Sequence, residues 1–177
     1  MQKISIIGSG GSGKTTLANK LSDKLGIKVY HLNKIWRKNE DEHISQEEFE
    51  KIQKDIIDNN DSFIFDGNYN NTLDLRLDAS DTIIFLDFPT GANISRSVKK
   101  NLTEKNSDNK DPSLDRTDKI NVKYIRWLAN YNKEERPKIL SKLDDLKLKK
   151  RIVIINTEAK RDLFLDSVDM DSNKASL

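Results

Sequence analysis

The sequence predicts an α/β fold, in which helices alternate with the strands of a parallel sheet. Short runs of apolar, mostly β-branched residues recur along the 177 residues, and amphipathic helical patterns separate them. The first run leads into a glycine-rich segment, and a helical pattern follows that segment. The length suits one domain with a single core and is short for two. We expect this domain to span residues 1–170.

The expected strands are five apolar runs, each long enough for a strand and too short for a helix. They are Ile4–Ile7, Ile27–Leu32, Phe63–Phe65, Thr82–Leu86 and Ile152–Ile155. Runs that stay apolar, instead of alternating with polar residues, are typical of parallel sheets that helices cover on both faces. The five runs therefore favour a buried parallel sheet.

Helical periodicity predicts the crossovers between these strands. Ser45 and Glu48 form a capping box that opens a helix ending near Asn60. A second helix is expected from about Thr90 through Lys100. Pro137 can open a late helix, because proline is tolerated in the first turn. Two late helices carry apolar residues at helical spacing, namely 120, 124, 127, 128 and 131 in one and 139, 140, 143 and 146 in the other.

Two segments of the second half have open interpretations. Residues 103–118 hold almost no apolar side chain, and we interpret them as a mobile lid, with a surface insertion of no function as the alternative. Tyr124 and Trp127 are interpreted as core residues, with a base-stacking platform as the alternative. The last residues, 171–177, are expected to form a frayed tail.

The glycine-rich segment Gly8–Thr15 reads GSGGSGKT and fits the phosphate-binding pattern G-x-x-x-x-G-K-[ST]. Its glycines let backbone N–H groups approach an anion, and the following helix adds unpaired donors and the positive end of its dipole. Lys14 can reach the outer phosphates, and Thr15 can place its hydroxyl on Mg²⁺. We expect a P-loop that binds a nucleoside triphosphate, and the alternative is a flexible turn. The expected contacts are Gly8, Ser9, Gly10, Gly11, Ser12, Gly13, Lys14, Thr15 and Thr16.

A second site element follows the third predicted strand. Phe63–Phe65 runs directly into Asp66–Tyr69, which places a carboxylate at the carboxyl end of a buried strand. If that strand neighbours the first, Asp66 can hold Mg²⁺ through its water shell. A plain Asp-Gly-Asn turn is the alternative. Asp87 is a weaker candidate of the same kind, and it can instead cap the following helix.

Composition limits the classes of partner. The chain has 31 basic and 29 acidic residues, so its net charge of +2 gives little support to nucleic-acid binding. No apolar run approaches the ~20 residues of a membrane span. The absence of cysteine excludes disulfides and thiolate metal sites. Because a predicted strand begins within a few residues of Met1, we expect no signal peptide and a cytoplasmic location.

Taken together, the motifs resemble those of the adenylate kinase-like nucleoside and small-molecule kinases. They resemble most closely those of the bacterial topology modulation, or FlaR-like, proteins. The matching segments are Gly8–Thr15, Tyr30–Leu32, Asp66–Tyr69, Leu73–Arg76, Thr82–Pro89, Arg96 and Arg136–Leu140. The resemblance covers nearly the whole chain. It implies a three-layer α/β/α P-loop NTPase fold, a five-stranded parallel sheet in the order 2-3-1-4-5, ATP on the P-loop, and a lid whose cations close on the transferring phosphoryl group.

Phosphoryl transfer depends on positioning and charge neutralisation, which suggests a role for each candidate. Lys14 and the loop amides would bind the β- and γ-phosphates, Thr15 and Asp66 would hold Mg²⁺, and Arg96 would contact the transferred group. Other arginines and one histidine are candidates for the acceptor site or lid. For each of these arginines the alternative role is a surface ion pair. For the histidine the alternative is a structural position at a strand end, with its hydrogen bonds satisfied within the protein. Further candidates for the acceptor site or lid are His31, Asn33, Asn68, Tyr69, Arg76, Arg116, Arg126 and Arg136.

Three departures from the resembling families bear on the acceptor. Adenylate kinases continue the Asp-Gly strand end with an aromatic, a proline and an arginine, whereas Asn68–Asn70 stands here, so AMP is not the expected acceptor. Asn33 occupies a position where relatives usually have an aspartate that could deprotonate an acceptor hydroxyl. After Arg96 come Lys99 and Lys100, which supply charge without the bidentate geometry of arginine.

The favoured hypothesis is transfer of the γ-phosphoryl group of Mg-ATP to a small molecule: a nucleoside, a nucleotide or another hydroxylated acceptor. The protein would act as a monomer or homodimer. Two alternatives stay open, a nucleotide-binding regulator that hydrolyses ATP slowly or not at all, and a protein associated with DNA topology. A kinase consumes ATP only with its acceptor, whereas a DNA-binding protein shows steep salt dependence.

Overall fold

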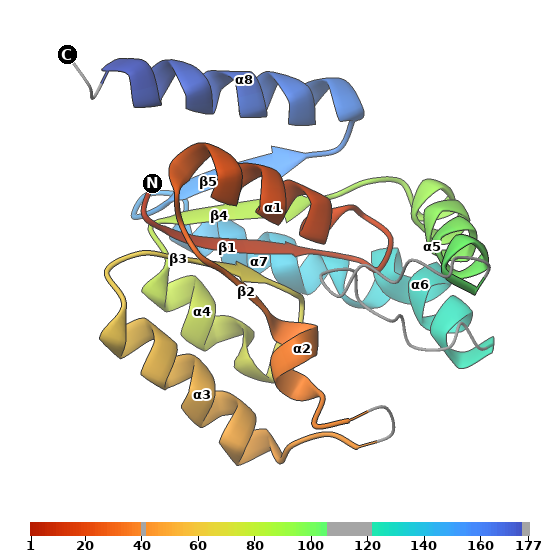
Figure 1. Cartoon of the computed structure of the whole chain (residues 1–177). Helices are drawn as coiled ribbons and strands as arrows, with labels where there is room; N and C mark the ends of the chain where they lie inside the picture. The colour runs from red at the N-terminus through yellow and green to blue at the C-terminus, as the bar shows by residue number, and fades with distance from the viewer. Residues whose placement is uncertain (40–41, 106–121, 175–177) are drawn as a thin grey trace.

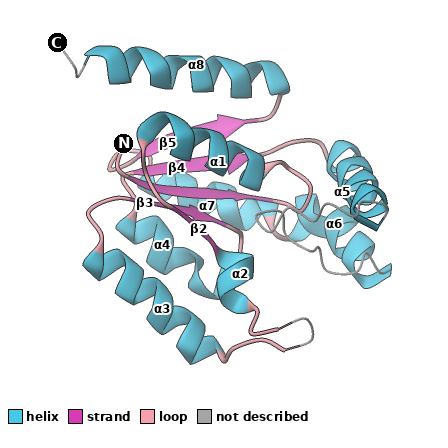
Figure 2. Ribbon diagram, viewed as in Figure 1, coloured by secondary structure: helices cyan, strands magenta, loops and turns pink. Residues whose placement is uncertain are grey.

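The structure, a computed structural model, describes residues 1–39, 42–105 and 122–174. These residues form three layers, with a central sheet between two sets of helices (Figure 1 and Figure 2). The strands are β1 (Lys3–Gly8), β2 (Val29–His31), β3 (Phe63–Asp66), β4 (Thr82–Leu86) and β5 (Arg151–Ile155). The helices are α1 (Lys14–Leu25), α2 (Leu32–Trp36), α3 (Gln46–Asn59), α4 (Leu73–Ala79), α5 (Thr90–Lys105), α6 (Val122–Glu134), α7 (Arg136–Leu146) and α8 (Glu158–Lys174), with a 3-10 turn η1 (Asn70–Thr72) before α4.

The sheet is parallel throughout, and its strand order is β2-β3-β1-β4-β5. This order confirms the prediction of a five-stranded parallel sheet. The carboxyl ends of all strands therefore meet at one edge, where Asp66 is in register with Ile6 on one side and with His31 on the other. Because β1 and β3 are neighbours, the P-loop and the Asp66 strand end lie side by side.

Alternate residues of the central strands enter different cores. Ile4 and Ile6 of β1 pack with Leu21 of α1 and Phe164 of α8, whereas Ile7 packs on the opposite face, with α4 and α7. Figure 1 shows α1 and α8 on one side of the sheet and α3, α4 and α7 on the other. Burying one such side chain contributes about 1.5–3 kcal/mol, so a strand buried on both faces is held strongly in register.

Helix ends follow local signals in the sequence. The Ser45 hydroxyl accepts a hydrogen bond from the Glu48 amide at 3.1 Å, which confirms the predicted cap of α3. Pro137 lies in the first turn of α7, as expected. Gly13 precedes helix α1 and Gly26 follows it, and both glycines have left-handed backbone angles, with φ of 91° and 68°.

Three helices lie outside the predicted set. Leu32, expected in the second strand, instead begins the short helix α2 and is fully buried. Helix α4 places Leu73 and Leu77 on one face, four residues apart. Helix α8 follows Thr157, whose hydroxyl accepts a hydrogen bond from the Lys160 amide at 3.2 Å. These helices are short or lack a regular apolar stripe, which explains why periodicity does not reveal them.

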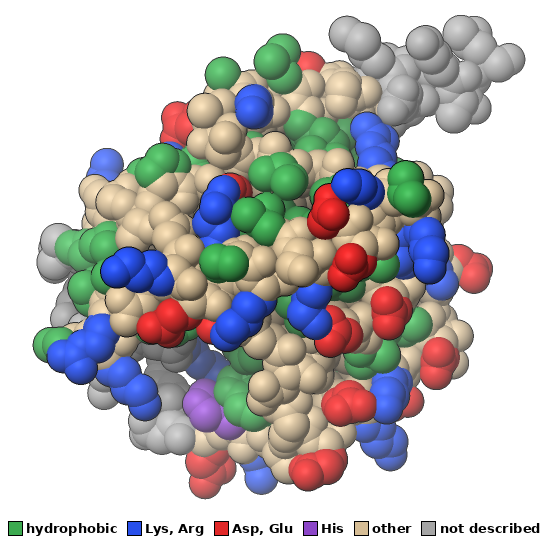
Figure 3. All heavy atoms as spheres, turned by 180° about the vertical axis from the view of Figure 1, so that it is seen from behind, with side chains coloured by type: hydrophobic (Ala, Val, Ile, Leu, Met, Phe, Trp, Pro, Cys, Tyr) green, Lys and Arg blue, Asp and Glu red, His purple; other side chains and the backbone are tan. Residues whose placement is uncertain are grey.

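Some expectations fall on residues that the structure does not describe. Of the segment expected as a lid, residues 103–105 end α5, and the rest, Arg116 included, lies outside the described residues. Of the expected tail, residues 171–174 belong to α8, and residues 175–177 lie outside the described part. Among the described helices, none is long and apolar enough to cross a membrane. Basic and acidic side chains are interspersed on the face drawn in Figure 3, which fits the net charge of +2.

Candidate functional site

A cavity of about 900 Å³ opens at the carboxyl edge of the sheet. The P-loop and the end of β3 form its base, α5 and α6 form one wall, and the segment after β2 forms the opposite wall. Seven of the predicted nucleotide contacts line it, namely Gly8, Gly10, Gly11, Gly13, Lys14, Thr15 and Thr16. Ser9 and Ser12 are buried. The predicted P-loop therefore faces this cavity.

The P-loop adopts a conformation that only glycine adopts without strain. Gly11 and Gly13 have φ angles of 72° and 91°. Lys14 reaches back over the loop, and its Nζ donates hydrogen bonds to the carbonyl oxygens of Gly8 and Ser9 at 3.1 and 2.8 Å. The ammonium group is thus held at the rim of a loop whose backbone is shaped to receive an anion.

Asp66 lies beside Thr15, as predicted. Its Oδ2 accepts a hydrogen bond from the Thr15 hydroxyl at 2.8 Å and lies 2.8 Å from Nδ1 of His31. The carboxylate is nearly buried at the end of β3, because β1 and β2 flank it on both sides. His31 therefore contacts Asp66, and it is not among the residues that line the cavity.

The Thr15 and Asp66 oxygens suit a hard divalent cation. A hydroxyl and a carboxylate at the floor of a phosphate site are the oxygen donors that Mg²⁺ favours. Among the described residues, no three His, Cys, Asp or Glu side chains gather into a metal-binding group. Mg²⁺ is usually held by one or two protein groups together with substrate phosphates, a number that Thr15 and Asp66 can supply.

The wall opposite α5 carries aromatic, amide and cationic side chains. Asn33, Asn68 and Tyr69 line the cavity, as expected for acceptor-site candidates. Trp36 and His43 line it as well, with their rings stacked 5.3 Å apart at 19°. Sequence reasoning does not identify Trp36, His43 or their neighbour Arg37, although an aromatic residue and a cation just after the second strand are a usable signal. Arg37 also lines this wall.

The candidate arginines occupy different environments. Arg96 lines the cavity, pairs with Glu158 at 2.8 Å and lies 4.7 Å above the Phe88 ring. Arg136 instead donates two hydrogen bonds to Asp87, which raises the pKa of Arg136 and accounts for Asp87 without a metal. Arg126 is exposed and Arg76 is buried, and neither lines the cavity.

Arg76 corrects the expectation of a surface or acceptor-side arginine. It is fully buried, and its guanidinium donates to the carbonyl oxygens of Gly67 at 2.9 Å, Asn68 at 2.7 Å and Tyr69 at 3.0 Å. Burial lowers the pKa of Arg76 to about 10, so the group stays charged at neutral pH. These bonds hold the loop after β3, in which Tyr69 has a positive φ of 25°. Arg76 therefore shapes the cavity wall from behind.

Replacing Arg76 with lysine is expected to lower the free energy of unfolding by about 2 kcal/mol. An ammonium group cannot span the three carbonyls, and each lost bond costs about 1 kcal/mol. Urea unfolding followed by circular dichroism measures the difference. Arg126→Lys, at an exposed position, serves as the matched control. Equal stability of R76K and wild type would show that the three bonds contribute nothing net.

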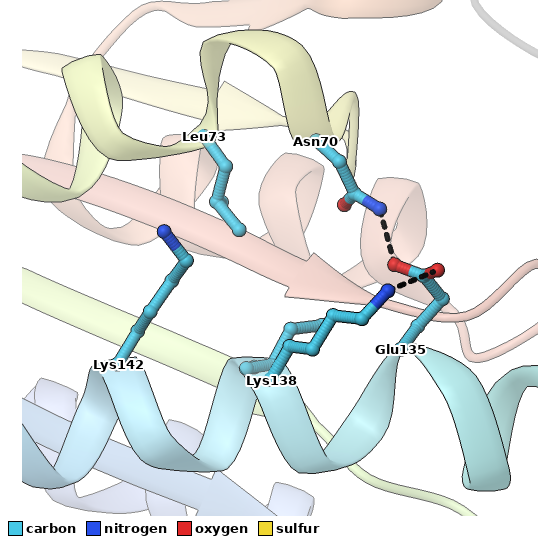
Figure 4. A pocket seen from close by; sticks show the side chains of 6 residues that line it. Asn70, Leu73, Glu135, Lys138 and Lys142 are labelled. Carbon is cyan, nitrogen blue, oxygen red and sulfur yellow. Dashed lines mark hydrogen bonds and ion pairs between the residues drawn. The ribbon is translucent and has the colours of Figure 1, made fainter.

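A smaller hollow of about 160 Å³ lies between the loop after β3 and α7. Figure 4 shows Asn70 and Lys138 both directed at Glu135, and the Asn70 amide donates to that carboxylate. Lys142 pairs with Asp74. Asn70 lines both hollows, so this polar cluster ties the wall of the large cavity to α7.

The interpretation of Tyr124 and Trp127 as core residues is wrong. Both line the cavity, and Trp127 is 36 % exposed, so they are not core residues. The Tyr124 hydroxyl lies against the P-loop, where a methyl group added at Gly10 would approach it to 2.0 Å. The base-stacking alternative, which periodicity could not separate from a core position, fits this arrangement better.

Comparison with known proteins agrees with this geometry. Residues 3–140 match the model of the cytidylate kinase-like family. No characterised protein is significantly similar in sequence. Two of the most similar structures are shikimate kinases. The one from Acinetobacter baumannii, in complex with shikimate, is 15 % identical, with 98 % of this chain and 94 % of that chain covered and a TM-score of 0.59. The one from Aquifex aeolicus is 17 % identical, with 98 % and 97 % covered and a TM-score of 0.55.

A third similar structure is a deoxyadenosine kinase from M. mycoides with the products dCMP and dCDP bound. It is 16 % identical, with 94 % of this chain and 98 % of that chain covered and a TM-score of 0.53. At such low identity these likenesses show the fold, which is the three-layer P-loop kinase fold. The finer resemblance to topology modulation proteins stays a prediction.

Proposed function

Since the chain belongs to the cytidylate kinase-like family, we propose that it transfers the γ-phosphoryl group of Mg-ATP to a nucleoside monophosphate. One observation carries this proposal. A single cavity joins the P-loop and the Asp66–Thr15 pair to a separate wall of aromatic, amide and cationic side chains. A phosphotransferase needs these two neighbouring subsites, whereas a nucleotide switch needs only the first.

The donor subsite is the P-loop. Its backbone N–H groups and Lys14 bind the β- and γ-phosphates, where negative charge builds up as the phosphoryl group leaves. Thr15 and Asp66 hold Mg²⁺, which neutralises charge on the phosphate oxygens when it is bound. Arg96 and Lys100 line the same space from α5 and add positive charge on the side of the outer phosphates.

The acceptor subsite favours a substrate that is already anionic. Asp66 is the only carboxylate among the described residues that line the cavity, and Thr15 and His31 already contact it. Asn33 cannot take a proton from an acceptor hydroxyl. A phosphate monoester needs no such base, because its oxygen is ionised at neutral pH. Arg37, on the same wall, provides a cation of the geometry that binds phosphate.

The aromatic side chains of this wall suit a nucleobase. The rings of Trp36 and His43 are stacked, and Tyr69 lies 6.0 Å from Trp36. Ring faces of this kind stack on planar bases, and the side-chain amides of Asn33 and Asn68 offer both donors and acceptors for a base edge. The family description makes cytidylate the first acceptor to test.

The proposed step balances without a protein base. An oxygen of the acceptor phosphate forms a bond to the γ-phosphorus, and the bond from this phosphorus to the β–γ bridging oxygen breaks. The electron pair stays on that oxygen, so ADP leaves and the acceptor becomes a diphosphate. Lys14 and the loop amides stabilise the charge that develops on the bridging oxygen.

An acceptor screen tests the proposal. With Mg-ATP, we expect at least one nucleoside monophosphate to raise ADP formation about tenfold or more above the rate without acceptor, a difference of ~1.4 kcal/mol in barrier. The matching nucleoside should not do so, because it lacks the ionised oxygen. Coupled measurement of ADP, with the diphosphate product identified by mass spectrometry, gives the answer.

Each other outcome of the screen supports a different function. Phosphorylation of nucleosides alone would identify a hydroxyl acceptor, and the imidazole of His43 on the wall would then be the candidate base. ATP hydrolysis that no acceptor changes would favour a nucleotide-dependent regulator. DNA binding with steep salt dependence, and no transfer, would favour the topology-associated alternative.

A further inference from the structure

Ser97 of α5 places a buried hydroxyl against the tip of the P-loop. The residue is 5 % exposed, and its Oγ has no hydrogen-bond partner among the described residues. A methyl group added at Gly11 would approach this Oγ to 2.4 Å. Ser97 also lines the large cavity. Ser97 therefore contacts the phosphate-binding loop through its buried hydroxyl and borders the space where a ligand would bind.

An unpaired buried hydroxyl is unfavourable in the free protein. A buried hydroxyl without a partner loses its hydrogen bonds to water and gains none in return, and alanine at the same helical position would avoid that loss. A serine inside a helix commonly donates to the carbonyl four residues earlier. Ser97 makes no such bond to Asn93, whose carbonyl oxygen instead lies against Gly11. A hydrogen bond within the helix therefore does not explain why a serine, and not an alanine, occupies this position.

Ser97 differs from the other buried polar side chains that lack a partner. Ser12 Oγ and Asn93 Oδ1 are unpaired as well, but their residues do not line the cavity. Among the described residues, Ser97 alone combines an unpaired buried polar atom with a place on the cavity wall. Since no described protein group bonds this hydroxyl and its residue borders the cavity, a ligand in the cavity is a candidate partner for it.

The surroundings indicate the chemistry of that partner. Arg96 and Lys100 line the cavity from the same helix, one residue before and three after Ser97. The P-loop residues line the same space, and a loop of this kind offers backbone N–H donors. Donors and cations converge here, and Asp66 is the only carboxylate among the described residues of the cavity lining. The partner is therefore an acceptor-rich anion.

We propose that Ser97 is a nucleotide-binding residue whose hydroxyl donates a hydrogen bond to a phosphate oxygen of the donor triphosphate, beside Gly11. The proposal rests on the proposed function, because it requires a triphosphate in the P-loop. It adds a contact from α5 that the P-loop pattern does not include. The hydroxyl then gains its hydrogen bond only when nucleotide binds. The free energy of that bond therefore contributes to nucleotide affinity and not to the stability of the protein alone.

Ser97→Ala tests this contact by calorimetric titration with a non-hydrolysable ATP analogue and Mg²⁺. We expect the Kd to rise about tenfold, which is about 1.4 kcal/mol. The melting temperature without nucleotide should be unchanged or higher, because an unpaired hydroxyl has been removed. Ser97→Thr, which retains the hydroxyl, should restore affinity. Ser95→Ala, on an exposed turn of the same helix, should match wild type in both measurements.

The outcomes separate this inference from the proposed function. An S97A protein with wild-type affinity, or one with a lower melting temperature and unchanged affinity, would make Ser97 a packing residue and overturn the inference alone. A wild-type protein that binds no Mg-nucleotide would overturn the proposed function, and this contact with it.

Discussion

Lys14→Ala is expected to reduce phosphoryl transfer by about 10³-fold, the upper range for removal of a single group that stabilises transition-state charge. In the free protein the ammonium group is held by the carbonyl oxygens of Gly8 and Ser9, at the rim of the loop. It lies where the β- and γ-phosphates would bind, and no other cation among the described residues reaches back over the loop from inside it. Arg96 and Lys100 approach from α5 and cannot take its place.

Two measurements check this effect. The first is ADP formation with a saturating acceptor, and the second is the rise in melting temperature with Mg-ATP. Nucleotide at 100 times its Kd stabilises the native state by about 2.7 kcal/mol, and K14A should lose most of that gain. Lys20→Ala, at an exposed position on the same helix, is the matched control. If K14A kept the wild-type melting shift and rate, the P-loop would not be the donor site.

Features that depend on short stretches of sequence were predictable. Each of the five apolar runs overlaps one of the five strands, and the pattern from Gly8 to Thr15 becomes a loop in which Gly11 and Gly13 have left-handed angles. The bond between Thr15 and Asp66 joins residues 51 positions apart, yet it follows from two local facts. Asp66 ends an apolar strand, Thr15 begins the helix that follows the glycine loop, and parallel strands end at one edge. The strand order supplied by the family resemblance brings them together.

The acceptor wall was less predictable, because it depends on contacts between distant segments. Helix α2 has five residues, too few for periodicity to show. Trp36 is held by ring contacts with Phe49 of α3 and Tyr69 after β3, at 5.0 and 6.0 Å. No local pattern states that these three segments meet. The residues of the acceptor wall therefore come together only because β2 and β3 are neighbours in the sheet.

The sequence prediction for Arg76 was wrong for a physical reason. An arginine is expected at the surface because burying a guanidinium is costly. Arg76 is buried nonetheless, because three backbone carbonyls of a loop seven to nine residues earlier accept its hydrogen bonds. Tyr124 and Trp127 show the same limit for apolar residues. Helical spacing predicts a common face, but it cannot say whether that face meets a core or a cavity.

Asp66→Asn is expected to leave the fold intact and to remove most of the Mg²⁺-dependent part of nucleotide binding and transfer. Asparagine has the same shape, and its Oδ1 can still accept the hydrogen bond that Thr15 donates at 2.8 Å. What is lost is the negative charge beside the Thr15 hydroxyl, and a divalent cation depends on that charge far more than on shape. We expect transfer to fall about 10²–10³-fold, as for other single charged groups that act on the transition state.

A magnesium titration at fixed ATP separates this role from a structural one. For wild type, nucleotide affinity should be much higher with Mg²⁺ than with EDTA, whereas D66N should show nearly the same affinity in both. Asp61→Asn, an exposed position just before β3, controls for the loss of one charge near the strand. If D66N kept the full difference between Mg²⁺ and EDTA, the carboxylate would serve to position His31, which lies 2.8 Å from the same oxygen. The metal would then have to be held by Thr15 and the phosphates without a protein carboxylate, because Asp66 is the only one among the described residues of the cavity lining.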